Sequence, residues 1–306
     1  MSQTHFAYLN LATAMTLVGS SVVVGKIVVT DFPIFMALTI RFAIALPPLL
    51  VFTYRHHTIE VPSRRLLMQM FLQALTGVFL FNILLLAGLK LTTAAQSGLL
   101  GSTTPALIAV FGWLLLHEHV RTYEWIGIAL TVAGVLVVNG IDVSTDDMRS
   151  LNSATVIGNL LVLGAFTCEA LFTVFRKTSS EIPPLMGATW VTSFGLLLCL
   201  PIGLFQLVQF DLSTININHV LVLLYYGLFV SALAYVLWFR GLEHASTSAA
   251  GILSSMLPIS AVILSALILS EPITHKHLMG LVLVLSAIGL MSLAPQLTDE
   301  NIVTGD

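Results

Sequence analysis

The sequence predicts an all-α integral membrane protein with ten transmembrane helices arranged as an inverted repeat of five plus five. Three observations lead to this prediction: the composition, the number of long apolar segments, and a motif that occurs twice at a constant separation. Hydrophobic residues make up 57% of the 306 residues and charged residues only 9%, whereas soluble domains carry about 25% charged residues. So few charges could not cover the surface of a water-soluble protein of this length.

The duplicated motif places proline and glutamate at matching positions in the two halves of the chain. Pro105 and Glu118 recur as Pro258 and Glu271, each pair 153 residues apart. The two copies read GLKLTTAAQSGLLGSTTPALIAVFGWLLLHEHV and GLEHASTSAAGILSSMLPISAVILSALILSEPI. A gapless match of this length indicates duplication, and a duplicated membrane-embedded chain is typical of transporters.

A spanning helix needs about 20 mostly apolar residues. Charges, prolines and polar clusters divide the sequence into ten such segments, near residues 5–28, 33–54, 66–88, 93–116, 122–140, 155–176, 185–208, 219–240, 246–269 and 275–294. Turns containing Pro33 and Pro272 are very short, because a proline can begin the next helix. The fifth and tenth segments lack charges in their interior, so we expect them at the periphery.

The segments form two repeats, residues 1–140 and 155–295, separated by a polar linker at 141–154 and followed by a tail at 296–306. Basic residues favour cytoplasmic loops. With a cytoplasmic N-terminus, these loops hold Arg55, Arg64, Arg65, Arg121, Arg176, Lys177 and Arg240. Both termini are therefore predicted to be cytoplasmic. Five spans per repeat then insert the second repeat upside down relative to the first.

With these motifs in view, the chain resembles the drug/metabolite transporter superfamily, specifically its ten-helix type with two EamA domains. The doubled motif carries the resemblance, and Arg41 in LTIRFAIALPPLL is similar to the second span of that family. The resemblance covers nearly the whole chain. It implies a transporter in a lipid bilayer that moves a small molecule, and known members move amino acids, vitamins, nucleotide-sugar-like metabolites, cationic dyes and drugs.

We therefore expect a secondary transporter of a prokaryotic-type inner membrane. It would export an amino acid or a related amphipathic metabolite by alternating access, driven by the substrate gradient or by protons. Uptake of a vitamin or nutrient and multidrug efflux remain open, because no visible residue encodes the direction. A membrane-embedded enzyme is the alternative from another class, but no catalytic constellation is visible. The net charge of −3 gives no basic patch for nucleic acid, and both a monomer and a homodimer remain open.

Two charged residues, Arg41 and Glu169, lie well away from the ends of their predicted spans. Arg41 is about eight residues into the second span, roughly 12 Å deep at 1.5 Å per residue, so it should face the protein interior or a water-filled cavity. It could bind a substrate carboxylate or tie helix ends together. Glu169 could bind a proton or a cationic group, or it could pair with the nearby basic residues Arg176 and Lys177.

Neutral polar and aromatic residues suggest a central pocket. Asn82 and Tyr235 are 153 residues apart and could face it from opposite sides. Trp238 lies one turn from Tyr235. Gln96 and Trp190 complete the candidate substrate-binding set. Amides with aromatic rings would suit an amphipathic organic solute, whereas the tryptophans could instead belong to the interfacial belt.

Other residues have conformational or packing interpretations. Pro105 and Pro258 could act as hinges or as static kinks. Glu118 and Glu271 could form a gate or could hydrogen-bond to the start of the next helix. Small residues such as Gly98 would let helices approach closely. The histidine pairs lack a metal-site spacing and no cofactor motif is present, so neither a metal nor a cofactor is expected.

Overall fold

The computed structural model describes residues 3–56, 62–117, 122–138, 153–177, 182–242, 253 and 256–303. These residues are mainly helical. In chain order the elements are α1 (Gln3–Asp31), α2 (Ile34–His56), α3 (Arg64–Gln73), η1 (Ala74–Leu80), α4 (Phe81–Leu89), α5 (Ala94–Gly101), α6 (Thr104–Leu116), α7 (Thr122–Val138), α8 (Ser153–Lys177), α9 (Pro184–Gln209), η2 (Leu212–Thr214), α10 (Ile217–Tyr225), η3 (Tyr226–Leu233), α11 (Ala234–Leu242), α13 (Met256–Leu269) and α14 (His275–Val303).

Seven helical segments are long and apolar enough to cross a membrane. They are His5–Asp31, Ile34–Arg55, Arg64–Leu89, Ala94–Leu116, Ser153–Arg176, Leu185–Gln209 and Ile217–Trp238. Each coincides with a predicted span to within a few residues. Three apolar helices are shorter, namely Trp125–Gly134, Met256–Leu269 and His275–Leu290, and each lies inside one of the other predicted segments. The chain is therefore a multi-pass membrane protein.

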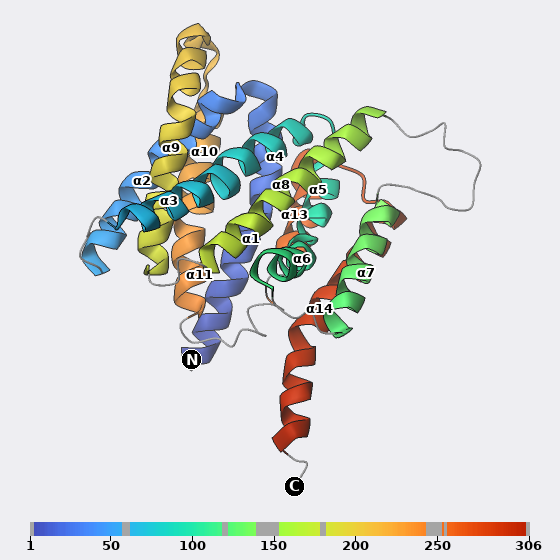
Figure 1. Ribbon diagram of the computed structural model, residues 1–306. Coiled ribbons are helices and arrows are strands. Elements are labelled where there is room, and N and C mark those ends of the chain that lie inside the picture. The colour runs from blue at the N-terminus through green and yellow to red at the C-terminus, as the bar shows by residue number, and fades with distance from the viewer. Residues whose placement is uncertain are drawn as a thin grey trace.

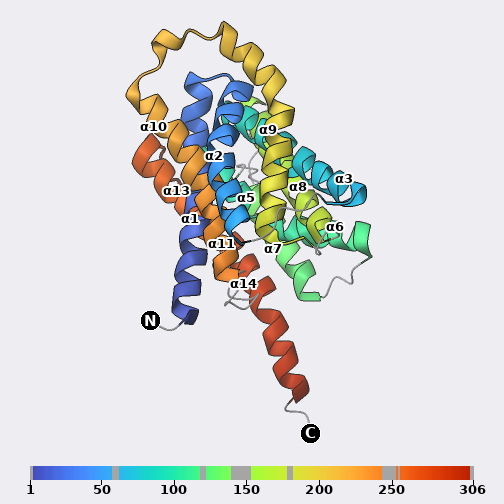
Figure 2. The same ribbon diagram turned by 90° about the vertical axis from the view of Figure 1, so that its left-hand side faces the viewer.

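Helices from the two halves of the chain pack in matching combinations. α1 packs against α11 and α13, and α8 packs against α4, α5 and α6. α2 packs on α9, while α7 packs on α14 at the opposite side of the bundle (Figure 1). The expectation that the fifth and tenth segments lie at the periphery is thus confirmed by α7 and α14. α1 begins and α14 ends at the same end of the bundle (Figures 1 and 2), which we call the N-terminal end.

Backbone irregularities recur with the same separation as the motif. η1 and η3 are turns of π-helix, and they end at Leu80 and Leu233, 153 residues apart. His117 and Ser270 follow α6 and α13, and both have a left-handed φ of 54°. π turns are rare and are frequent at functional sites. The duplication read from the sequence therefore extends to details of the backbone.

Glycines allow α5 to lie very close to α13. A Cβ built on Gly98 would be 2.2 Å from the Cβ of Ala261, far inside van der Waals contact. On α1, a Cβ on Gly19 would be 2.4 Å from the carbonyl oxygen of Leu257. The packing interpretation of Gly98 is confirmed, and these contacts join the two halves of the chain.

We expect Gly98→Ala to destabilise the protein, because α5 and α13 must separate to admit the methyl group. Overpacking of this kind costs about 1–3 kcal/mol. The matched control is Gly289→Ala on α14, where nothing lies within 4 Å of the added Cβ; there the helix propensity of alanine should leave stability equal or slightly higher. Thermal unfolding of both variants in detergent tests this, and equal melting temperatures would refute the close contact.

Candidate functional site

The Arg41 side chain joins three segments that are distant in sequence. Its Nε donates to Ser231 Oγ of η3 at 2.6 Å, and Nη1 donates to Asn82 Oδ1 of α4 at 2.7 Å. The guanidinium also lies over the ring of Tyr226, with Cζ 3.9 Å from the ring centroid. A planar cation is well suited to such a combination of hydrogen bonds and ring stacking. Arg41 therefore occupies the point where α2, α4 and η3 meet.

The partners of Arg41 are themselves held by the backbone next to the two π turns. Ser231 Oγ donates to the carbonyl oxygen of Tyr226, five residues earlier, at 3.0 Å. Asn82 Nδ2 donates to the carbonyl oxygen of Val78 in η1 at 2.6 Å. Each partner thus has its oxygen available to accept from Arg41. The π turns shape the two sides of this cluster.

The charge of Arg41 is not neutralised by any acidic side chain that the structure describes. Within the described ranges, no acidic side chain forms an ion pair with Arg41. Its side chain is partly accessible, whereas Asn82, Tyr226 and Ser231 are buried. A charged group inside a membrane protein ordinarily pairs or faces water. The remaining N–H groups of the guanidinium can therefore donate to the oxygen of a further anionic or carbonyl group.

Glu169 lies beside a break in the span formed by α5 and α6. Residues Ser102 and Thr103 interrupt the helix, and Thr104 Oγ1 donates to Glu169 Oε2 at 3.3 Å. Pro105 is at the start of α6, so it begins a half-helix rather than kinking a continuous one. An acid next to a helix N-terminus is electrostatically favoured. Arg176, seven residues further along α8, donates to the carbonyl oxygen of Ile182 at 2.6 Å.

Tyr235 links the surroundings of the two charges. Its hydroxyl is within electrostatic range of both the Arg41 guanidinium and the Glu169 carboxyl. The Tyr235 side chain is partly accessible, as are those of Arg41 and Glu169. Hydrogen bonding links Arg41 to Asn82, and Tyr235 interacts electrostatically with Arg41 and Glu169; we call these four residues the central site.

Gln96 belongs to a different cluster, at the turn between α4 and α5. The Thr92 hydroxyl contacts Gln96 Oε1, at 2.6 Å, and Asn159 Oδ1. Trp190 packs with Phe194, the ring centroids 6.1 Å apart, against an apolar core cluster. Trp238 is partly exposed, one turn beyond Tyr235. The aromatic box expected from the sequence is therefore not assembled around Gln96 and Trp190.

Two oppositely charged residues fasten the turn between α4 and α5. Lys26 of α1 donates to the carbonyl oxygens of Leu89 and Thr92, the latter at 2.6 Å. Glu271 accepts from the backbone N–H groups of Ala94 and Ala95, both at 2.9 Å. Each charge thus neutralises the end of a helix dipole. One of the two sequence-based interpretations was that Glu271 hydrogen-bonds to the start of the next helix. Glu271 does accept hydrogen bonds at the start of a helix, but that helix is α5, in the other half of the chain.

Two of the predicted residues, Glu118 and Pro258, are not part of the clusters described above, and three residues that contact Arg41 or Glu169 were not predicted. Glu118 falls outside the described residues, and Pro258 is buried near the start of α13. Tyr226, Ser231 and Thr104 were not anticipated. Their only sequence signal is polarity inside apolar spans, which many packing residues share. Among the described residues, no group of three or more His, Cys, Asp or Glu side chains could hold a metal.

Comparisons with known proteins point to one family. The profile of the EamA-like transporter family matches residues 5–140 and 156–293. The uncharacterized transporter YetK of Bacillus subtilis is 40% identical over 284 residues, which cover 92% of this chain and 85% of YetK. An uncharacterized transporter of Archaeoglobus fulgidus is 25% identical, over 88% of this chain and 90% of that protein.

A solved crystal structure also resembles this fold. It aligns with a TM-score of 0.65 over 94% of this chain and 96% of the other, at 17% identity. At this identity the similarity concerns the fold alone. The WAT1-related protein At3g02690 of Arabidopsis thaliana, described as chloroplastic, is 28% identical over 72% of this chain and 53% of its own length.

Proposed function

The chain belongs to the EamA-like transporter family, and from that premise we propose that it exports a small organic solute carrying a carboxylate. An amino acid or a related amphipathic metabolite is the first candidate. The observation that carries this proposal is Arg41, a partly accessible guanidinium that has two hydrogen bonds to neutral oxygens and no described acid partner. A carboxylate would complete its coordination through charge-assisted hydrogen bonds.

The second charge of the central site favours a solute with a cationic group as well. Glu169 lies beside the start of α6, and Tyr235 is in range of both Glu169 and Arg41. In this proposal Arg41 binds the carboxylate, Glu169 binds an ammonium group or a proton, and Tyr235 and Asn82 line the space between. A zwitterion would then leave no uncompensated charge in the bilayer interior.

We propose further that ten spans form two five-helix repeats of opposite orientation, residues 1–140 and 155–295. The matched packing of α1 and α8, the paired π turns, and the paired left-handed caps support this arrangement. The three shorter apolar helices would complete the ten. Both termini would be cytoplasmic, in the inner membrane of a prokaryotic-type cell.

Alternating access would use the contacts that join the repeats. Glu271 of the second repeat holds the start of α5 in the first, and Lys26 holds the preceding carbonyls. These contacts close the end of the bundle opposite the N-terminal end. Opening there requires their separation, and the break before Pro105 provides a place where α5 and α6 can change their angle.

A thermal-shift screen of the purified protein, followed by counterflow in proteoliposomes, tests the proposed solute class. A ligand at 100 times its dissociation constant stabilises the folded state by about 2.7 kcal/mol. We expect a higher melting temperature with amino acids and no shift with their methyl esters, because the ester removes the anion that Arg41 binds. The stabilising solute should then accumulate in liposomes preloaded with it.

Other outcomes decide between the alternatives. Equal shifts with acids and esters would contradict carboxylate recognition, and shifts with cationic dyes alone would favour multidrug efflux. Cells that accumulate the labelled solute rather than extrude it would establish uptake. Enzymatic turnover without flux of any solute would refute transport.

A further inference from the structure

An open apolar groove lies along the last two turns of α2. Leu50, Val51, Tyr54 and Arg55 line it, and its volume is about 290 Å³. Leu50 and Tyr54 are four positions apart, as are Val51 and Arg55, so the residues form two adjacent rows that together make a broad stripe along the helix. Leu50, Val51 and Tyr54 remain 41%, 51% and 77% exposed. No other described part of the chain covers this stripe.

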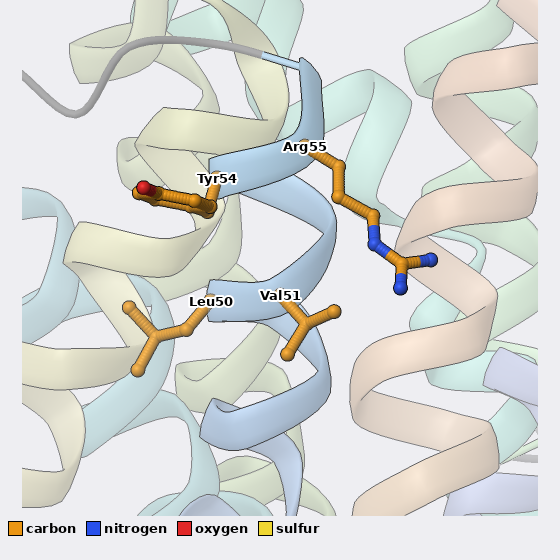
Figure 3. Close-up of a pocket in the computed structure, with 4 residues that line it drawn as sticks. All are labelled: Leu50, Val51, Tyr54 and Arg55. Atoms are coloured by element: carbon orange, nitrogen blue, oxygen red, sulfur yellow. The ribbon is translucent and has the colours of Figure 1, made fainter.

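The groove has an apolar part and a cationic end. Figure 3 shows Leu50 and Val51 one turn before Tyr54 and Arg55, with the Arg55 side chain extending across toward the neighbouring orange helix. Arg55 is exposed and forms no ion pair with any acid among the described residues. Tyr54, beside it, has the amphipathic ring typical of the level where hydrocarbon meets headgroups.

Other cations gather at the same end of the bundle. Arg64 and Arg65 begin α3, and Arg240 is in the last turn of α11; all three are exposed. α2 and α11 both run toward the N-terminal end (Figures 1 and 2). Basic surfaces at this position attract the anionic leaflet, and basic pockets between spanning helices bind anionic headgroups.

We propose that this groove binds one anionic phospholipid. An acyl chain lies against Leu50 and Val51, the Tyr54 ring packs beside the glycerol region, and the phosphate is held by the Arg55 guanidinium. Two features distinguish such a site from ordinary lipid-facing surface: the hollow itself, and at its mouth an exposed arginine that has no ion pair with a described acid. Arginine matches phosphate geometry through paired N–H donors. This proposal concerns a surface on α2 and is independent of the solute carried by the central site.

Native mass spectrometry of the purified full-length protein, titrated with phosphatidylglycerol, tests the site. We expect one phosphatidylglycerol to bind more tightly than phosphatidylcholine with the same chains. Arg55→Gln should weaken this binding about fivefold, the effect of one basic side chain near an anionic headgroup. The matched control is Arg64→Gln, which removes the same charge at the same end but outside the groove, and should change binding less than twofold.

A second variant tests the apolar part. Val51→Trp keeps every charge but fills the hollow, and it should also weaken phosphatidylglycerol binding. Thermal unfolding without added lipid verifies that each variant is folded. Equal binding of the two lipids, or equal losses in Arg55→Gln and Arg64→Gln, would overturn the proposal. So would inorganic phosphate that binds with the same dependence on Arg55, because the site would then hold a soluble anion.

Discussion

Arg41→Ala is expected to reduce counterflow of the carboxylate solute by at least about a hundredfold. The substitution removes the cation that would bind the substrate and leaves Ser231 Oγ and Asn82 Oδ1 without their donor. A hydrogen bond to a charged group contributes about 1.5–3 kcal/mol, and about 3 kcal/mol corresponds to two orders of magnitude in binding. Arg41→Lys keeps the charge but loses the planar fork, so we expect an intermediate loss of about tenfold.

A structural role for Arg41 would give a different pattern. If Arg41 only tied α2, α4 and η3 together, Arg41→Ala would lower the melting temperature and would affect every solute equally. Carboxylate recognition instead predicts that the variant no longer distinguishes an amino acid from its methyl ester. Arg64→Gln, an exposed arginine at the start of α3, is the matched control for loss of one positive charge. An unchanged ligand-induced stabilisation in Arg41→Ala would remove Arg41 from the site.

Glu169→Gln is expected to abolish flux driven by a pH gradient while exchange of solute for solute continues. Glutamine has the size of glutamate and its amide oxygen can still accept from Thr104 Oγ1, which donates to Glu169 at 3.3 Å. It cannot bind and release a proton. If Glu169 carries the coupled proton, only the coupling is lost. The measurement compares both modes of flux in the same proteoliposomes.

Two controls separate coupling from folding. Thr104→Val removes the hydrogen bond but keeps the acid, so pH-driven flux should persist. Asp211→Asn changes an acid on the exposed connection between α9 and α10. Hydrogen bonds from Ser213 lower the pKa of Asp211. Its carboxylate therefore stays ionised near neutral pH and does not bind and release a proton there, so this substitution removes an acid that cannot carry the coupled proton. Equal loss of both flux modes in Glu169→Gln would assign Glu169 to substrate binding or folding instead.

The long apolar segments and the motif separation were read correctly from the sequence for physical reasons. A bilayer imposes a minimum length of apolar helix, so seven spans could be placed within a few residues. The depth of Arg41 in the bilayer stays a prediction, made by counting residues along one helix. Glu271 was recognised as a residue of a helix junction, although its actual partners, Ala94 and Ala95, lie 177 and 176 residues away.

The π turns and the partners of the central charges could not be predicted in this way. A π turn shifts backbone hydrogen bonds by one residue without changing how apolar the segment is, so η1 and η3 leave no trace in hydropathy. Gln96 and Trp190 were grouped with Arg41 by residue type. In the structure, Gln96 lies at the turn between α4 and α5, and Trp190 packs against an apolar core cluster.

The sequence by itself determined that this protein is a duplicated helical membrane protein, because hydrophobicity, helix length and motif spacing are properties of the chain read in one dimension. Only the tertiary structure decided that Arg41 meets Tyr226 and Ser231, the latter 190 residues away in sequence, and that Glu169 accepts a hydrogen bond from Thr104. Apolar burial is non-directional and allows many packings. Which polar groups meet depends on the rotation and close approach of each helix, set by contacts such as that of Gly98 with Ala261.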